Sequence, residues 1–170
     1  AAAHVVGIDE KTTVSALGQF ECGFGRAEQF RLGQAQARMM LVKNPAGYNQ
    51  VINLIAHDVG SCKLAFLLND RFADGTDISW IWDVDFERLC EMGDTLREIY
   101  VSGVRADDMA LRFAYAGFPT NRIHVVKDYK ALCEQSASHK LPVYMMPTYT
   151  AMLALRSTIS KTYGYKQFWE

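Results

Sequence analysis

The 170-residue sequence has no excess of either charge and no long hydrophobic run. Its 18 lysines and arginines stand against 19 aspartates and glutamates, which leaves a net charge of -1. A protein that tracks nucleic-acid phosphates normally shows a basic excess. No apolar run approaches the roughly 18 residues of a membrane-spanning helix, and the first residues lack the basic segment of a secretory signal. We therefore expect a cytosolic protein without nucleic-acid partners or a transmembrane segment.

Motifs that bind metals or nucleotides are also missing. The four cysteines and four histidines lie far apart, with no CxxC, CxH or HExxH pair, so we expect buried free thiols and no metal site. There is no GxxxxGK[ST] phosphate loop, no GxGxxG after a strand and no GxSxG elbow. By itself, the chain is not expected to hydrolyse ATP or to act as a serine hydrolase.

Composition divides the chain near residue 25. Residues 1–7 read as the end of an alanine-rich helix and residues 12–20 as a second helix, and both are too short to bury a core. The Gly-Phe-Gly run at 23–25 predicts a flexible joint. We expect residues 1–25 to be the tail of a preceding domain with its linker, and residues 26–170 to form one domain. On this interpretation the chain is a piece of a longer protein.

Strands and helices alternate after the joint. A helix is expected to begin at Pro45, which suits a first helical turn. Further helices are expected at 106–116, 129–136 and 148–159, and strands at 27–32, 35–42, 63–68, 78–82, 98–101, 124–126 and 143–145. Repeated units of this kind with apolar strands predict an α/β fold, with a Rossmann-like, mostly parallel sheet flanked by helices on both faces.

The stretch DGTDISWIWDVDFE, Asp74–Glu87, carries the most chemistry. Two tryptophans and two isoleucines predict the strand at 78–82, and carboxylates crowd its carboxyl end, where sites gather in parallel sheets. Asp83 and Asp85 at that end could orient a histidine, bind a metal or cap the next helix. Asp77 precedes the strand and is expected at the opposite sheet edge, roughly 20 Å away at about 3.3 Å per residue.

A second polar stretch, KNPAGYN at 43–49, joins a strand to the helix that Pro45 opens. Such a loop can meet a nucleotide or substrate at the helix N-terminus, or it can be an ordinary turn. A similar junction, YMMPTYT, lies at 144–150.

Ser102 and Arg105 belong to another junction of this kind, SGVRADDMA. Ser102 or Asp107 could cap the helix that follows. Arg105 could hold an anion or pair with a carboxylate, for which Asp83, Asp85 and Asp108 are the candidates. Four polar junctions on one side of a sheet predict a site or a docking face there.

These same stretches resemble one family. LVKNPAGYNQVI, LLNDRFADGTDISWIWDVDFE and VSGVRADDMALRFAYAG are similar to the C-terminal domain of the MurT family, the Mur-ligase-like subunits of bacterial lipid II isoglutaminyl synthase. The resemblance runs from about residue 26 to residue 150. The preceding segment resembles the close of a Mur ligase central domain, which agrees with a joint near residue 25.

The resemblance implies an activity for the complete protein. MurT proteins use ATP and Mg²⁺ to activate the α-carboxyl of D-glutamate in the lipid II stem peptide as an acyl phosphate, at the inner face of the membrane. A partner glutaminase, GatD, supplies ammonia from glutamine. The phosphate loop, the Mg²⁺ ligands and a zinc insertion of the family lie upstream of this chain, so no cofactor is expected on the chain alone.

The resemblance also implies residue roles. The partner brings a cysteine and a histidine, and an aspartate of this domain completes the triad; that role falls to Asp83, with Asp85 as the alternative. The residues expected to face the nucleotide are Arg26, Lys43, Asn44, Tyr48 and Asn49. Those expected to support the site or the partner are Ser102 and Arg105.

Two other functions remain open at this point. The domain could be a docking module that anchors the glutaminase without a catalytic residue. It could also belong to an ordinary amino-acid-adding Mur ligase, but those enzymes usually carry a Tyr-Ala-His motif where this chain has KNPAG at 43–47.

Overall fold

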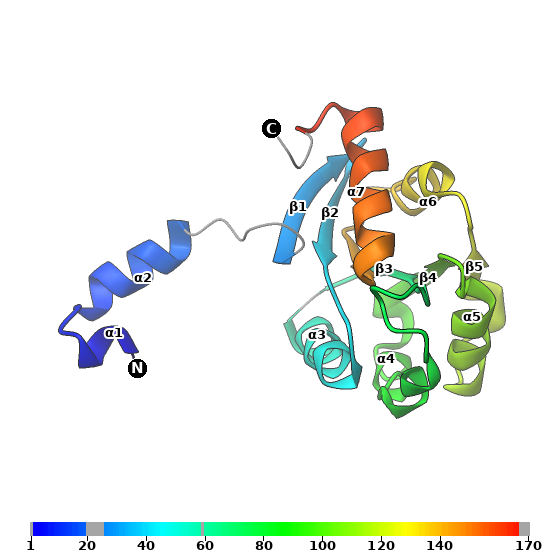
Figure 1. Cartoon of the computed structure of the whole chain (residues 1–170), viewed down its shortest axis with the longest axis horizontal. Helices are drawn as coiled ribbons and strands as arrows, with labels where there is room; N and C mark the ends of the chain where they lie inside the picture. Colours follow the sequence, from blue (N-terminus) through cyan, green and yellow to red (C-terminus); the bar gives the residue numbers. More distant parts are fainter. Residues whose placement is uncertain (1, 20–25, 59, 167–170) are drawn as a thin grey trace.

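The computed structural model describes residues 2–19, 26–58 and 60–166. Six strands form one sheet in the order β1-β2-β6-β3-β4-β5 (Figure 1). The first pair, β1 and β2, is antiparallel, and every other neighbouring pair is parallel. The prediction of a mostly parallel sheet flanked by helices is therefore confirmed.

The elements have the following bounds. The strands are β1 (Arg26–Leu32), β2 (Ala35–Met40), β3 (Cys62–Leu67), β4 (Leu96–Ser102), β5 (Ile123–Val125) and β6 (Val143–Pro147). The α-helices are α1 (Ala2–Val5), α2 (Glu10–Gln19), α3 (Pro45–Asp58), α4 (Glu87–Cys90), α5 (Ala106–Tyr115), α6 (Tyr129–Ser136) and α7 (Tyr149–Tyr163). The 3₁₀ helices are η1 (Ser79–Asp83), η2 (Gly93–Thr95) and η3 (Thr120–Arg122).

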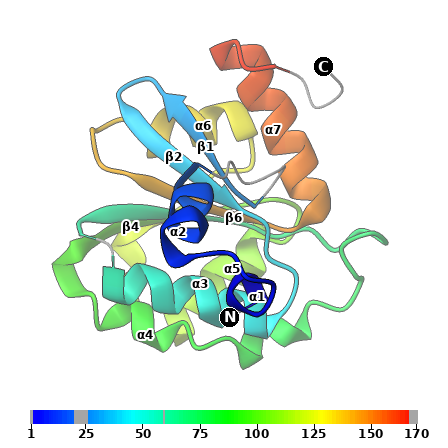
Figure 2. The same cartoon turned by 90° about the vertical axis from the view of Figure 1, so that its left-hand side faces the viewer.

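Helices cover both faces of the sheet. Helices α3, α4 and α5 lie on one face, and α6 and α7 lie on the other (Figure 2). Strand β3 shows the consequence, because all six of its residues are buried. Leu64 and Phe66 pack into the cluster with α3 and α5, whereas Ala65 and Leu67 pack into the cluster with α6 and α7. A strand buried on both faces reads as a continuous apolar run, which is why the sequence located it correctly.

Residues 78–82 do not form the predicted strand. Residues 79–82 belong to η1, which Ile78 precedes, and the Ile81 N–H donates to the Ile78 carbonyl at 3.1 Å. The carboxylate of Asp77 accepts the N–H of Ser79 at 2.8 Å and so begins the turn. Ile81 and Val84 are buried while Trp82 is half exposed, so burial recurs every third residue, as in a 3₁₀ helix. The strand prediction, and the distant position that it gave Asp77, are wrong.

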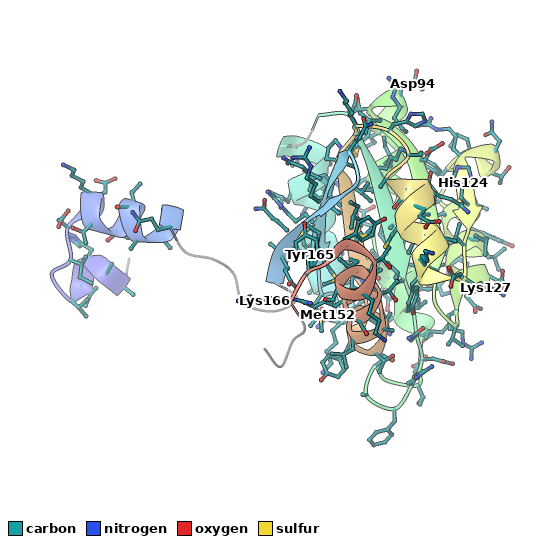
Figure 3. The ribbon with its side chains drawn as sticks, turned by 90° about the horizontal axis from the view of Figure 1, so that it is seen from above. Asp94, His124, Lys127, Met152, Tyr165 and Lys166 are labelled. Atoms are coloured by element: carbon teal, nitrogen blue, oxygen red, sulfur yellow. The ribbon has the colours of Figure 1, made fainter. Side chains whose placement is uncertain are left out.

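The free edge of β1 is covered by the end of the chain's described part. Gly33, at φ +58°, turns the hairpin between β1 and β2. On the outer side of β1, the N–H of Arg31 donates to the hydroxyl of Tyr165, which is labelled in Figure 3, at 2.5 Å. The Tyr165 ring meets the Phe30 ring edge-on at 5.2 Å. Tyr165, which follows α7, therefore covers the sheet edge at Arg31.

Helices α1 and α2 bury none of their described residues. Asp9 caps α2, because its carboxylate accepts the N–H of Thr12 at 2.9 Å. The predicted joint at residues 23–25 lies outside the described residues, so the division near residue 25 stays a prediction. None of the helices described here has the length and apolarity to cross a bilayer.

Candidate functional site

The carboxyl ends of four strands surround one pocket of about 300 Å³. The loops after β3 and β4 lead to the α5 side of the sheet, whereas those after β5 and β6 lead to α6 and α7. Loops that part to opposite faces leave a crevice at the carboxyl ends of neighbouring strands. The residues that line it are Asn69, Arg71, Gly103, Val104, Lys127, Tyr129, Thr150 and Ala154.

Asn69 ties the floor of this pocket together. Its amide oxygen accepts the N–H of Val104 at 2.9 Å, and its amide nitrogen donates to Thr150 Oγ1 at 2.9 Å. Thr150 in turn donates its N–H and its hydroxyl to the two carboxylate oxygens of Asp74, at 2.7 and 2.5 Å. At Gly103, whose φ is +88°, a Cβ would lie 2.4 Å from the Leu68 carbonyl oxygen. These hydrogen bonds and the close backbone contact at Gly103 hold the loops around the pocket in place.

Ser102 and Arg105 lie on either side of Gly103 and Val104, which line the pocket. Ser102 is fully buried, and its hydroxyl has no hydrogen-bond partner among the described residues. Arg105 pairs with Asp70 at 2.7 Å and with Asp108 at 3.7 Å, so its charge is neutralised away from Asp83 and Asp85. Helix α5 begins without a side-chain cap. The expectation that Ser102 or Asp107 caps it is therefore wrong.

The loop at 43–49 is split between the surface and the core. Lys43 is exposed and makes no hydrogen bond or ion pair with any described residue. Asn44 accepts the N–H of Gly47 at 2.9 Å and so begins α3. Asn49, farther along α3, accepts the N–H of Asp85 at 3.0 Å and ties the helix to the segment after η1.

Tyr48 corrects the prediction for this loop. Its side chain is fully buried and packs against the rings of Phe66, Trp80 and Phe86 at centroid distances of 6.0, 5.4 and 5.8 Å. A side chain within the core cannot face a nucleotide on the outside of the domain. The side chain of Arg26, expected to act beside this loop, lies outside the described part of the structure.

Asp83 and Asp85 lie at the end of η1 and just after it, in a segment that contacts both α3 and α5. Asp83 is the last residue of η1 rather than the end of a strand. Both side chains are exposed, and neither carboxylate forms a hydrogen bond or an ion pair with a described residue. Neither caps α4, whose N-cap position is Phe86 and has no side-chain hydrogen bond. The segment between Asp77 and Glu87 thus contains two unengaged carboxylates.

Arg112 of α5, which sequence reasoning missed, organises the backbone around Asp83. Its guanidinium is almost completely buried and donates to the carbonyl oxygens of Ile81 and Val84 at 3.2 and 2.7 Å. It also makes a two-pronged pair with Glu87 at 2.8 and 3.0 Å. The Arg112 hydrogen bonds hold the pKa of Glu87 below its ordinary value. One feature of the sequence indicates this role: position 112 is an arginine beside Phe113, on the apolar face of α5.

The described residues contain neither a cluster of metal ligands nor a thiol with a lowered pKa. No group of three or more His, Cys, Asp or Glu side chains in residues 2–19, 26–58 and 60–166 could hold a metal ion. Cys62 and Cys133 are buried free thiols and Cys90 is half-buried, while Cys22 lies outside the described residues. Burial raises the pKa of Cys62 to about 11 and of Cys133 to about 12, so both are protonated and unreactive.

Comparison with solved structures supports the fold. MurF from Acinetobacter baumannii superposes with a TM-score of 0.62 at 13% identity, covering 96% of this chain and 35% of that one. Folylpolyglutamate synthase from Mycobacterium tuberculosis, complexed with ADP and AMPPCP, superposes with a TM-score of 0.60 at 13% identity, covering 95% and 36%. At these identities the likeness concerns the fold alone.

Comparison of sequences points to one family. The chain is 34% identical over 164 residues to the MurT subunit of lipid II isoglutaminyl synthase (glutamine-hydrolyzing) from Streptococcus pneumoniae, covering 94% of this chain and 36% of that protein. The Staphylococcus aureus MurT subunit is 29% identical over 158 residues, covering 93% and 36%. The chain therefore spans about a third of the length of these relatives. The family model for the MurT ligase C-terminal region matches residues 41–152, and the chain belongs to that family.

Proposed function

We propose that this chain is the C-terminal domain of the ligase subunit of a lipid II isoglutaminyl synthase. The complete protein would amidate the α-carboxyl of D-glutamate in lipid II, in the cytoplasm at the inner face of the membrane, with ammonia from a GatD-type glutaminase. The names of the two MurT relatives and their coverage of nearly all of this chain support this function. The family membership supports the position of the domain within the ligase.

Within that enzyme, Asp83 completes the catalytic triad of the partner glutaminase. The observation that carries this role is an exposed carboxylate without a partner in a segment whose backbone is fixed. The carbonyls of Ile81 and Val84, on either side of Asp83, are both held by Arg112. The carboxylate of Asp77, by contrast, already accepts the N–H of Ser79 within its own turn.

The chemistry requires an acceptor at this place. The partner's cysteine loses its proton to the partner's histidine, and the thiolate attacks the carboxamide carbon of glutamine. The imidazolium returns that proton to the departing nitrogen, which leaves as ammonia. Water then hydrolyses the thioester, so that glutamate is released and the thiol is restored. Asp83 accepts the other imidazole N–H, which fixes the tautomer and stabilises the imidazolium.

Fewer groups of the 43–49 loop are free to bind a nucleotide than the sequence predicts. Lys43 is the free cation that the loop offers, and the N–H of Gly47 is already used by Asn44. The loop could therefore contact a nucleotide through the Lys43 side chain, but the N–H of Gly47 is not available to hold a phosphate. ATP, held with Mg²⁺ by the preceding domain, would supply the activation of the carboxyl. Lys43, with Arg26, Asn44 and Asn49 near it in sequence or structure, would close over it as a lid does.

A second candidate function is a docking module without a catalytic role. It is favoured by the apolar surface around Asp83, where Trp82, Tyr115 and Leu111 are 50%, 72% and 52% exposed. The rings of Trp82 and Tyr115 meet edge-on at 5.6 Å. Aromatic residues of this kind are common anchors in protein interfaces.

The substitution Asp83→Asn separates these functions. In the complete ligase subunit reconstituted with its glutaminase, we expect complex formation to persist and glutamine hydrolysis to fall, by as much as about 10⁴-fold by analogy with other triads. Ligation driven by free ammonia should persist, because that reaction bypasses the glutaminase. The measurements are glutamate release, ammonia-dependent amidation and size-exclusion chromatography.

Asp85→Asn is the matched control, since it removes the second exposed carboxylate of the segment. Normal hydrolysis in this variant beside a loss in Asp83→Asn assigns the role to Asp83. The reverse result moves the role to Asp85. Normal hydrolysis in both variants leaves the docking module as the function of this domain.

A further inference from the structure

We propose that Arg112 is the positioning residue that holds Asp83 in the geometry needed by the partner's histidine. This inference rests on the proposed role of Asp83 and goes beyond it, because Arg112 lies on a different element, α5. The two residues are 29 positions apart in the sequence.

The contacts of Arg112 surround Asp83 without including it. One guanidinium nitrogen, Nε, donates to the carbonyl two residues before Asp83, that of Ile81. Another, Nη2, donates to the carbonyl directly after it, that of Val84. A single planar group thus fixes the backbone on both sides of the carboxylate. Arginine can do this because its donors lie in a rigid fork.

Glu87 keeps the guanidinium from neutralising Asp83. Arg112 makes four hydrogen bonds, two to the carbonyls of Ile81 and Val84 and two to Glu87, of the five that a guanidinium can donate. The buried positive charge is therefore satisfied by Glu87, as a desolvated cation requires. Asp83 is left as an unpaired acceptor beside a cation that is already paired.

Aromatic rings close the two sides of this arrangement. The guanidinium carbon of Arg112 lies 5.4 Å from the Trp82 ring centroid and 5.3 Å from that of Phe86. Phe86 is fully buried against Phe66 and Phe113 in the core. The backbone of Asp83 is thereby fixed to the same core that carries the sheet, and a fixed point of attachment for the carboxylate is what orientation of a histidine demands.

Arg112→Lys tests the inference. Lysine keeps the charge but cannot reach two carbonyls and a carboxylate together from one planar group. In the complete ligase subunit with its glutaminase, we expect the kcat for glutamine hydrolysis to fall about 10- to 100-fold, the size of effect that a displacement near 1 Å produces. The KM for glutamine should change less than twofold, because Asp83 does not contact glutamine. Ammonia-driven ligation and complex formation should be unchanged.

Arg122→Lys is the matched control. Arg122 also donates to two backbone carbonyls, those of Arg97 and Gly93 at 2.7 and 3.3 Å, and lies over an aromatic ring, Phe118, at 5.2 Å. It makes the same kinds of contact between η2, β4 and η3, without touching η1. A general loss of stability would lower hydrolysis in both variants, whereas the positioning role predicts a loss only in Arg112→Lys.

Glu87→Gln provides a second variant that leaves the buried arginine in place. The Glu87 side chain is 54% exposed and glutamine has the same shape, so the change disturbs packing little. It replaces a charged two-pronged pair with one weaker acceptor, which frees the guanidinium to turn toward Asp83. A several-fold fall in kcat is expected. An unchanged kcat in both Arg112→Lys and Glu87→Gln overturns the inference.

A double variant distinguishes this inference from the proposed function. If Arg112 acts through Asp83, adding Arg112→Lys to Asp83→Asn gives no further loss of hydrolysis. Losses that multiply show that Arg112 acts by another route, and the inference is wrong while the role of Asp83 stands. Full hydrolysis by Asp83→Asn alone instead rejects the proposed triad role, whatever Arg112 does.

Discussion

Tyr48 and Asn49 are neighbours in the sequence, but they do different work on α3. The ring of Tyr48 fills the space between the sheet and η1, because its centroid lies within 6.0 Å of those of Phe66, Trp80 and Phe86. Asn49 lies one step around the helix and holds the backbone of Asp85. The two contacts together fix η1 and its following segment to α3.

At position 48, the ring should matter more than the hydroxyl. The Tyr48 hydroxyl is 3.5 Å from the Met146 carbonyl, a long hydrogen bond. We expect Tyr48→Phe to lower the free energy of unfolding by less than about 1.5 kcal/mol, and Tyr48→Ala to lower it by roughly 3–5 kcal/mol through the cavity left behind. Urea unfolding of the chain measures both values. Equal losses in the two variants would show that the hydroxyl carries the stabilisation.

Residue-level roles were the least predictable part of the site. The sequence favours Asp83 and Asp85 because they follow an apolar stretch that predicts a strand and because the family resemblance implies a triad aspartate in this domain; η1 removes the first of these reasons. The sequence could not show that Arg112 reaches back to the carbonyl of Ile81, because the contact depends on how α5 packs against η1. Tyr48 was misplaced for a related reason: a polar tip in a polar loop does not reveal that the ring below it is buried.

At the scale of elements, the parallel strands were predictable and η1 was not. Strands β3 and β6 and the second half of β4 are mostly apolar runs followed by polar junctions, and burial on both faces produces that pattern directly. Residues 78–82 contain the same aromatic and branched side chains, but they pack against α3 and α5 rather than within the sheet. Asp77 supplies the hydrogen bond that begins a turn. Strand propensity was outweighed by that local bond and by packing.

The close approach of the loops after β3 and β4 yields a prediction for glycines. Gly103 and Gly117 have nearly the same φ, +88° and +89°, but a Cβ would meet the Leu68 carbonyl only at Gly103. We expect Gly117→Ala to cost about 1–2 kcal/mol from the left-handed backbone alone. Gly103→Ala should cost more, because the backbone after β3 must also shift. Chemical denaturation measures the free energy of unfolding of both variants. Equal losses would show that the backbone after β3 can shift without a cost in stability.

At the scale of the whole molecule, burial of thiols and phenols makes the fold sensitive to alkali. Cys62 and Cys133 have pKa values of about 11 and about 12 in the folded chain, against 9.0 when unburied. Above pH 9 the unfolded chain therefore loses protons that the folded chain keeps. The two protonated thiols therefore contribute their full stabilisation to the folded chain below pH 9, and this stabilisation is lost as the pH rises from about 9 to about 12. Burial raises the pKa of Tyr48 in the same direction.

This gives an expected slope of roughly 1 kcal/mol per pH unit for each thiol between pH 9 and pH 11. Cys133→Ala should be less stable than the parent at pH 8, because it loses packing, and its stability should then decline less steeply. Urea unfolding at pH 8, 9 and 10 measures the difference in slope. Parallel pH profiles for the parent and the variant would contradict the assignment.

The contact of Tyr165 with β1 bears on how copies of this molecule avoid one another. An edge strand presents unpaired N–H and carbonyl groups to which a second strand can add. At Arg31 both groups are directed at Tyr165, whose hydroxyl takes the N–H at 2.5 Å and lies 3.5 Å from the carbonyl. At the opposite edge, β5 has three residues and offers little length for pairing. The Tyr165 phenol thus blocks strand addition at Arg31, and its loss would expose one N–H and one carbonyl of the β1 edge to pairing with a second molecule.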